Sequence, residues 1–340
     1  MTMQLLSRKY YIQPVNQEGQ MSLLIPAGLI ILGFLALIKG ADWMVTGSSA
    51  LAKKNNISDL AIGLTIVAFG TSAPELVVNT FAAIDQQPDI VLGNVIGSNN
   101  FNLFVILGIV GLIAPIAVQH STVWKEIPIS LFAVLCLYVF ANGFLFQGDK
   151  LISRIDGMLM LLFFGMFLYY VAQQLKSEAP DDMEVAKNLS NQKIWTFIVI
   201  GLAGLIIGGK LVVDNAVDLA TQFGVSKKII GLTIVAAGTS LPELVTSVVA
   251  ALKKNSDIAI GNVIGSNIFN ILLILPVSTL ISPIEFNTAF NTDIYLLIAG
   301  TIFLFVAMFT GKKKKLDRWE AGLLLLVFVG YTVYLIQKEI

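Results

Sequence analysis

The stretch GLTIVAFGTSAPEL at Gly63–Leu76 occurs a second time in this sequence, as GLTIVAAGTSLPEL at Gly231–Leu244. A second block, GNVIGSNNFN at Gly93–Asn102, recurs as GNVIGSNIFN at Gly261–Asn270. Both recurrences are 168 residues apart, and 28 of the 45 positions that run from the first block to five residues past the second are identical. Chance does not produce such identity, so the chain consists of two homologous halves.

The composition surrounding these blocks is that of a membrane protein. Of 340 residues, 56% are hydrophobic and 13% are charged, and the 22 basic and 22 acidic residues give no net charge. The mean hydropathy is +0.81. A soluble protein of this kind would expose large apolar patches, and a nucleic-acid-binding protein would carry a basic surplus. A single cysteine, Cys136, and a single histidine, His120, exclude a disulfide framework and most imidazole chemistry.

A helix that spans a bilayer needs roughly 20 mostly apolar residues. The sequence predicts an all-α integral membrane protein with ten transmembrane helices. They lie at about 22–46, 60–84, 91–115, 126–146, 155–174, 194–217, 229–251, 258–281, 292–310 and 320–337.

The two halves are predicted to have opposite orientations. Five predicted helices separate equivalent points, and an odd number turns the second half upside down, which gives an inverted repeat of the kind found in alternating-access transporters. A duplicated scaffold without transport is the alternative. We divide the chain into an N-terminal tail (1–21), a first five-helix repeat (22–174), a cytoplasmic linker (175–193) and a second five-helix repeat (194–340).

Basic residues set the expected orientation in the membrane. Seven lie in loops on the N-terminal side of the first helix and thirteen on the other side, four of them in the run Lys312–Lys315. The positive-inside rule therefore places both termini outside and 175–193 in the cytoplasm. We expect a multi-pass protein of the plasma (inner) membrane, with the lipid bilayer as its partner and the lysine run on anionic headgroups.

Two acidic residues lie near the middle of predicted spans. Glu75 and Glu243 occupy equivalent positions in the repeated block, and neither block contains Lys or Arg. An ionised carboxylate at this depth costs at least a few kcal/mol, so it normally faces a partner or an ion path. Two neighbouring carboxylates without a fixed cation need a mobile cation or protons.

The residues before each glutamate are expected to break the helix. Gly70–Pro74 contains a proline without an amide hydrogen, and Gly238–Pro242 repeats the arrangement. We expect freed carbonyls, such as those of Ala68 and Ala236, to point at a cation.

A helix cap is the alternative for the same residues. Ser72 with Glu75, and Ser240 with Glu243, match a capping box. The cap and the ion-binding interpretation are compatible, since a capped half-helix is itself a break.

The second block adds further oxygen atoms. Ser98 and Asn102 are four residues apart and share one helix face, as do Ser266 and Asn270. The remaining amides are predicted to bond between helices: Asn94, Asn99, Asn262 and Asn267. The glycines are predicted to let helices approach closely: Gly93, Gly97, Gly261 and Gly265. A set of carboxylate, hydroxyl, amide and carbonyl oxygens suits Na⁺ and Ca²⁺ and does not suit Zn²⁺ or Cu.

Both blocks resemble the α-repeats of the cation/calcium exchanger superfamily, in particular those of prokaryotic sodium/calcium exchanger-like membrane proteins. The resemblance covers the chain from about residue 22 to the end. It implies ten helices in two inverted halves, exchange of Ca²⁺ against Na⁺ by alternating access, and sliding of the helices at 22–46 and 194–217. By motif position, the implied cation ligands are Ala68 (carbonyl), Thr71, Ser72, Glu75, Ser98, Asn102, Ala236 (carbonyl), Thr239, Ser240, Glu243, Ser266 and Asn270.

One departure from the family bears on the counter-ion. Some members carry Asp at the position of Asn102 or Asn270, including potassium-dependent exchangers in the second repeat, whereas this chain has Asn at both. The missing third charge argues against K⁺ dependence and leaves Na⁺ and H⁺ open. Two ionised glutamates are balanced by one Ca²⁺, two Na⁺ or two protons.

The function expected from the sequence is thus a secondary Ca²⁺/Na⁺ antiporter. A Ca²⁺/H⁺ antiporter on the same fold and a cation channel are the alternatives. HExxH and GxSxG are absent, so an enzyme is not expected. Nor do we expect a cofactor, a nucleic acid or an obligate protein partner. Lys39 with Asp42, and Lys210 with Asp214, are predicted to form ion pairs or to extend to the membrane surface.

Overall fold

The fold is all-helical apart from short strand pairs, in a computed structural model that describes residues 17–144, 150–174, 189–223, 236–311 and 314–339. In the first half the elements are α1 (Gln17–Lys54), α2 (Asp59–Ile62), π-helix η1 (Gly63–Val67), α3 (Ala68–Thr71), α4 (Ala73–Ile84), α5 (Pro88–Asn100), π-helix η2 (Phe101–Ile106), α6 (Leu107–Ile113), β1 (Ile116–Ala117), π-helix η3 (Thr122–Glu126), α7 (Ile127–Ala141), β2 (Leu151–Ile152) and α8 (Arg154–Gln174).

The second half repeats this order. Its elements are α9 (Asn191–Gln222), α11 (Ala236–Gly238), α12 (Leu241–Leu252), α13 (Ser256–Phe269), π-helix η6 (Asn270–Ile274), α14 (Leu275–Ile281), β3 (Ile284–Glu285), 3₁₀-helix η7 (Thr288–Phe290), α15 (Asn291–Ala307), β4 (Lys315–Leu316) and α16 (Arg318–Glu339).

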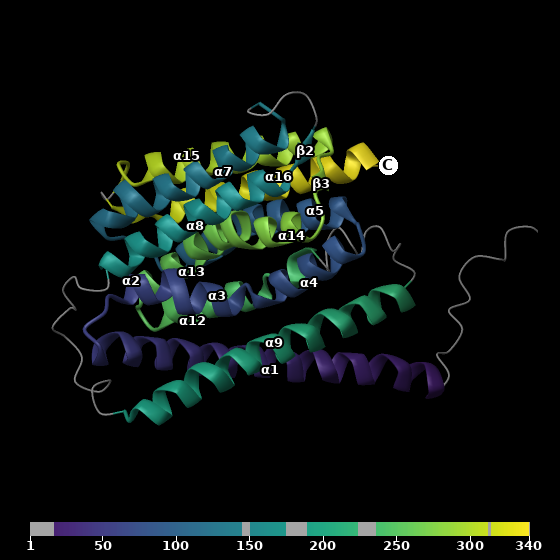
Figure 1. The fold of residues 1–340 in the computed structure, drawn as a ribbon. Helices are drawn as coiled ribbons and strands as arrows, with labels where there is room; N and C mark the ends of the chain where they lie inside the picture. The colour runs from purple at the N-terminus through teal and green to yellow at the C-terminus, as the bar shows by residue number, and fades with distance from the viewer. Residues whose placement is uncertain (1–16, 145–149, 175–188, 224–235, 312–313, 340) are drawn as a thin grey trace, which may run out of the picture.

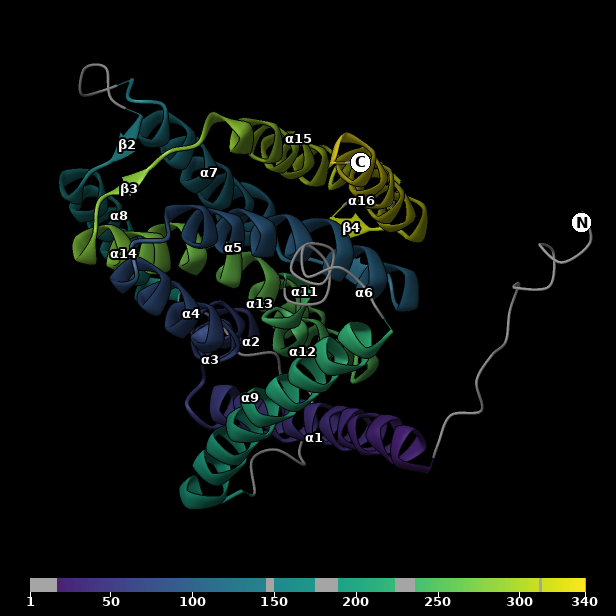
Figure 2. The same ribbon diagram turned by 90° about the vertical axis from the view of Figure 1, so that its right-hand side faces the viewer.

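Two long helices, α1 and α9, cross each other in a layer of their own at the bottom of Figures 1 and 2. Glycines line the crossing. A Cβ added to Gly40 would lie 2.7 Å from the carbonyl oxygen of Gly201, and one added to Gly208 would lie 2.7 Å from that of Gly33. The offset of 168 relates the two contacts to each other. Glycine thus brings the two backbones into direct contact, as is usual where membrane helices pack tightly.

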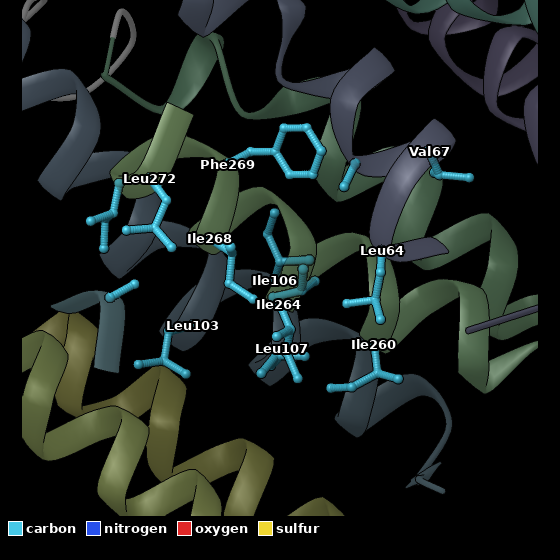
Figure 3. Close-up of a cluster of buried hydrophobic side chains, with 14 of the residues drawn as sticks. Leu64, Val67, Leu103, Ile106, Leu107, Ile260, Ile264, Ile268, Phe269 and Leu272 are labelled. Carbon is cyan, nitrogen blue, oxygen red and sulfur yellow. The ribbon is translucent and has the colours of Figure 1, made fainter. Parts of the chain in front are cut away.

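The buried centre of the molecule is α13, in which every residue from Ile258 to Phe269 is buried. Figure 3 shows Ile260, Ile264 and Ile268 along this helix, in the same cluster as Leu64 of η1. The spacing of four places the three isoleucines on one helix face. Because the polar residues on the other faces of α13 are buried as well, the helix is surrounded by protein on all sides.

The two halves are intertwined through their last helices. β1 pairs antiparallel with β4, and β2 with β3, so each pair joins one half to the other. Arg154 at the start of α8 donates to the last two carbonyl oxygens of α14, at 3.0 and 3.2 Å. Arg318 at the start of α16 does the same to α6, at 3.1 and 3.4 Å. Each arginine satisfies carbonyls that have no partner within their own helix.

The number of spanning helices agrees in part with the prediction. Within the described residues, eight helices are long and apolar enough to cross a membrane, and the stretch from α2 to α4, bent by 47°, makes a ninth. The all-α membrane fold is therefore confirmed. The predicted span 229–251 falls partly outside the described residues and otherwise holds α11 and α12, so the count of ten stays a prediction.

Several boundaries differ from those predicted. Helix α1 begins at Gln17, inside the predicted tail 1–21, and it continues to Lys54 rather than to residue 46. Helix α9 likewise extends beyond 194–217. Hydropathy places only the apolar part of a helix, whereas polar turns continue it into the interface. Most of the predicted linker, 175–188, lies outside the described residues.

Substitution of Gly40 tests the α1–α9 crossing. We expect Gly40→Ala to lower the free energy of unfolding in detergent by about 1–3 kcal/mol, because the added methyl group meets backbone rather than a side chain that can turn away. Gly28→Ala on the same helix is the control, since no atom of the described residues lies within 4 Å of its added Cβ. Thermal unfolding of both variants measures the difference, and an equal effect would contradict the close approach.

Candidate functional site

The first repeated block folds into a broken helix. Ser72 separates α3 from α4 with φ −85° and ψ 7°, and Pro74 stands in the first turn of α4. The expectation that Ala68 has a freed carbonyl is wrong. Its oxygen accepts from the Ser72 amide at 3.0 Å and lies 3.3 Å from the Thr71 hydroxyl. A proline removes the partner of the carbonyl four residues earlier, which here is that of Gly70.

The second block breaks in the same manner. Ser240 has φ −88° and ψ 7°, and it lies between α11 and α12. Ala236 is the first residue of α11.

The capping-box interpretation of the two serines is wrong. Neither Ser72 nor Ser240 makes a side-chain cap hydrogen bond. The Ser72 hydroxyl instead lies 2.9 Å from Glu243 Oε1 and 3.0 Å from Ser266 Oγ, and the Ser240 hydroxyl lies 3.4 Å from Glu75 Oε1. Each serine therefore donates toward the glutamate of the other half.

Threonine and asparagine form a second reciprocal pair of contacts. Thr71 donates to Asn262 Oδ1 at 3.0 Å, and Thr239 donates to Asn94 Oδ1 at 3.3 Å. The predicted role of these asparagines, bonding between helices, is confirmed. Asn262 also donates to the carbonyl oxygen of Glu243 at 3.3 Å, which fixes the direction of its amide because a carbonyl can only accept.

The asparagines of the second block form a third reciprocal pair. Asn102 Nδ2 donates to Asn267 Oδ1 at 3.0 Å, and Asn270 Nδ2 donates to Asn99 Oδ1 at 3.2 Å. All four amides are buried. π-Helical turns begin beside them, at Phe101 and Asn270, and such turns often occur at functional sites.

The cluster is enclosed and rich in oxygen atoms that lack a partner. Nine of the ten residues predicted to bind through their side chains are at most 2% exposed: Thr71, Ser72, Glu75, Ser98, Asn102, Ser240, Glu243, Ser266 and Asn270. Within the described residues, one oxygen of each glutamate and of each ligand asparagine accepts no hydrogen bond: Glu75 Oε2, Glu243 Oε2, Asn102 Oδ1 and Asn270 Oδ1. Buried acceptors of this kind are suited to coordinating a hard cation.

The glycine prediction is confirmed for the second half. A Cβ added to Gly265 would lie 2.7 Å from that of Ala68, and one added to Gly261 would lie 3.0 Å from the carbonyl of Leu60. In the first half, no atom of the described residues lies within 4 Å of a Cβ added to Gly97. Gly97 is equivalent to Gly265, and by the same offset its contacts would be with residues 232 and 236, whose side chains are not among those described.

Sequence reasoning missed the residues behind the cluster. Asn79 accepts from Asn94 Nδ2 at 3.2 Å, as Ser247 accepts from Asn262. Each follows a glutamate by four residues, so the helical spacing was a usable signal.

It also missed three buried acids outside the cluster. Asp156 accepts from the Ser153 amide and Glu320 from the Asp317 amide, both at 2.7 Å, as first-turn acids do. Glu126 accepts from the Tyr170 hydroxyl. The first two contacts lie at the starts of α8 and α16, whereas the third joins η3 to the C-terminal part of α8.

Comparison with known proteins decides the family. The chain matches the family described as "Sodium/calcium exchanger protein" twice, over residues 25–173 and 193–337. The chain belongs to this family. It is 38% identical to a protein named putative antiporter CaxA from Alkalimonas amylolytica, over 93% of this chain and all of that protein. It is 33% identical to the sodium/calcium exchanger MaX1 of Methanosarcina acetivorans, over 90% of this chain and 97% of that protein.

A solved structure of the family has the same fold. The sodium-calcium exchanger NCX_Mj, soaked with Na⁺ and Sr²⁺, superposes with a TM-score of 0.78 at 32% identity, over 92% of this chain and 99% of that one. The structural similarity and the family match therefore lead to the same family.

Replacing Ser72 separates an ion-binding hydroxyl from a helix cap. We expect Ser72→Ala to weaken Ca²⁺ binding about tenfold, because a hydrogen bond to a charged group contributes about 1.5–3 kcal/mol. The control is Ser58→Ala, since Ser58 is a true cap whose Oγ accepts from the Ala61 amide at 3.2 Å. That variant should lose about 1 kcal/mol of stability and no affinity. Radioactive Ca²⁺ binding and thermal unfolding distinguish the two, and unchanged Ca²⁺ binding by Ser72→Ala would contradict the assignment.

Proposed function

We propose that this chain is a cation/calcium antiporter that exchanges Ca²⁺ for Na⁺ by alternating access, with both ions using one buried oxygen cluster. The observation that carries the proposal is the set of four unpartnered acceptor oxygens, two from each half, in the enclosed cluster. The family supports a membrane exchanger, and the printed names of MaX1 and NCX_Mj refer to sodium and calcium.

The proposed ligands are those assigned by motif. From the first half they are the Ala68 carbonyl, Thr71, Ser72, Glu75, Ser98 and Asn102, and from the second half the Ala236 carbonyl, Thr239, Ser240, Glu243, Ser266 and Asn270. Glu75 and Glu243 are the central pair. The three reciprocal hydrogen-bond pairs that link the halves support this set.

Charge balance explains why such a site exchanges ions rather than leaking them. Two buried carboxylates are neutralised by one Ca²⁺ or by two Na⁺, and moving them bare across the membrane is costly. A loaded site is therefore the form that changes its access. A third Na⁺ on hydroxyl and carbonyl oxygens would make the exchange electrogenic.

The proposed architecture is two inverted five-helix halves with ten spans in the plasma (inner) membrane. The termini lie outside and the segment 175–193 in the cytoplasm. The surplus of basic residues on one side supports this orientation. The long crossing helices α1 and α9 are the proposed mobile layer, because they form a layer of their own along one side of the remaining helices (Figure 2).

Uptake into vesicles that contain the purified protein tests the counter-ion. We expect Ca²⁺ uptake when a Na⁺ gradient is imposed and none when only a pH gradient is imposed. Uptake driven only by pH would establish Ca²⁺/H⁺ antiport in place of the proposal. Uptake that needs no counter-ion on the opposite face would establish a channel.

The central glutamates give the decisive variants. We expect Glu75→Gln and Glu243→Gln each to abolish Na⁺-driven Ca²⁺ uptake, because either one leaves a single charge opposite a divalent ion. Glu285→Gln is the matched control, since Glu285 is an exposed acid of β3. Wild-type uptake by both central variants would overturn the assignment, provided that the control folds and transports normally.

A further inference from the structure

Two asparagines outside the proposed ligand set decide how the ligand amides face. Asn99 and Asn267 lie three residues before Asn102 and Asn270, and each accepts a hydrogen bond from the ligand asparagine of the other half. We propose that Asn99 and Asn267 are positioning residues that turn the ligand carbonyl oxygens toward the cation, and that only Asn99 can reverse its own amide. This inference rests on the proposed function.

The orientation of Asn267 is fixed by backbone. Its Nδ2 donates to the carbonyl oxygen of Asn99 at 3.4 Å, and a carbonyl can only accept. Its Oδ1 is therefore left to face Asn102, which must present Nδ2 to it. The Oδ1 of Asn102 is thereby turned away from Asn267 and has no other partner among the described residues. One backbone carbonyl thus sets the direction of two side-chain amides.

The orientation of Asn99 is not fixed in this way. Its Oδ1 accepts from Asn270, but its buried Nδ2 has no partner in the described part of the chain. Reversing this amide therefore sacrifices no second hydrogen bond. Reversing Asn267 would break its bond to Asn99 and set two acceptors against each other.

The two ligand positions should therefore tolerate a carboxylate unequally. An aspartate in place of Asn270 only accepts, and Asn99 can turn to donate to it. An aspartate in place of Asn102 would meet the Oδ1 of Asn267, which cannot turn. Residue 99 thus determines whether the site accepts a third acid, and so it bears on ion selectivity.

Four variants in vesicles test the inference: Asn270→Asp, Asn102→Asp, Asn99→Leu and the double variant Asn99→Leu with Asn270→Asp. We expect Asn270→Asp to keep its KM for Ca²⁺ within about threefold, and Asn102→Asp to raise KM at least about tenfold. Asn99→Leu should raise KM without lowering the maximal rate. In the double variant, the KM for Ca²⁺ should rise above that of Asn270→Asp alone, because leucine at position 99 cannot donate a hydrogen bond to the aspartate. Thermal unfolding confirms that each variant is folded.

Equal behaviour of the two aspartate variants, or tolerance that survives the loss of the Asn99 amide, would overturn the inference. An inactive wild-type protein would instead overturn the proposed function. Binding of radioactive Ca²⁺ to the purified variants, measured without a gradient, keeps the two outcomes separate, because it needs no transport.

A second, independent observation is an ion pair between the long helix α1 and the turn after α12. Lys253 Nζ lies 2.6 Å from Asp42 Oδ1, 2.9 Å from the Asp42 carbonyl and 2.6 Å from Thr46 Oγ1. Asp42 thus pairs across the fold and not with Lys39, which was one of the two alternatives expected from the sequence. The pair is partly exposed, with 33% and 42% of the lysine and aspartate side chains accessible.

The offset of 168 gives this pair a counterpart of opposite sign. It relates Asp42 to Lys210 and Lys253 to Asp85. Within the described residues, Asp42 with Lys253 forms an ion pair and Lys210 with Asp85 does not. The helices differ accordingly, since α1 packs against α12 whereas the equivalent α9 hardly touches α4.

We infer that the two pairs are alternate latches: Asp42–Lys253 closes in one access state and Asp85–Lys210 closes in the other. In an inverted repeat, the opposite state is reached when the halves exchange conformations. The contact of one half then breaks as its counterpart forms. In the counterpart pair, lysine replaces aspartate and aspartate replaces lysine. Lys210 and Asp85 therefore still attract each other, although neither is identical to its equivalent in the first pair. This inference rests on the alternating access of the proposed function.

Paired cysteines test the latch in a Cys136→Ala background, which removes the chain's single cysteine. One variant carries Asp42→Cys with Lys253→Cys and the other Asp85→Cys with Lys210→Cys. Each variant is treated with a short bifunctional thiol reagent, once in Na⁺ and once in Ca²⁺. We expect the ion that raises the cross-linking yield of one cysteine pair to lower the cross-linking yield of the other. Yields that rise together, or a second pair that never reacts, would overturn the inference.

Charge variants supply a second readout. Asp42→Asn should shift the Ca²⁺ dependence of uptake about twofold to fivefold, the range for partly exposed ion pairs. Asp42→Lys combined with Lys253→Asp should restore it. The cross-linking yields do not depend on transport, so an inactive wild-type protein would count against the proposed function and not against the latch.

Discussion

This structure depends on one constraint, two carboxylates that lie buried within a membrane-spanning bundle and form no ion pair with a lysine or arginine of the described residues. Glu75 and Glu243 are each 1% exposed. A buried ionised group needs polar neighbours, and the serine hydroxyl that approaches each glutamate comes from the opposite half. Neither half therefore completes the surroundings of its own glutamate. The duplication is a chemical requirement of the site as well as a feature of the sequence.

The rest of the fold keeps the halves in register. Both strand pairs join one half to the other, and each last helix begins with an arginine that binds the other half's carbonyls. The site lies in the centre of this intertwined body, along α13. The crossing pair α1 and α9 is joined to it less extensively, and close glycine contacts hold that pair together. A site within the intertwined body, beside a separate two-helix layer, fits the alternating access proposed above.

The sequence predicted the membrane fold, the repeated blocks and the interhelical role of their asparagines. These conclusions depend on hydropathy and on an exact repeat, both of which a single chain contains. The freed Ala68 carbonyl failed because the Ser72 amide, four residues later, still donates to it. The Ser72 cap and the Lys39–Asp42 pair share another cause, since both were inferred from neighbours within one helix. In the structure, Ser72 and Asp42 find their partners 171 and 211 residues away. Local rules cannot rank such a contact against a nearby one.

The places where the repeat is inexact show what the fold retains. Asn79 and Ser247 are equivalent positions with different side chains, yet each accepts a hydrogen bond from the asparagine that holds a site threonine. When Asn79 accepts this hydrogen bond, its own Nδ2 stays buried without a partner in the described part of the chain, which is unfavourable. Ser247 has no such group. Asp42 and Lys210 are also equivalent positions with different side chains, but of the pairs Asp42–Lys253 and Lys210–Asp85 the first alone forms within the described residues. At the asparagines, by contrast, the hydrogen bond persists through the change of residue, so physical complementarity, rather than residue identity, is what the two halves share there.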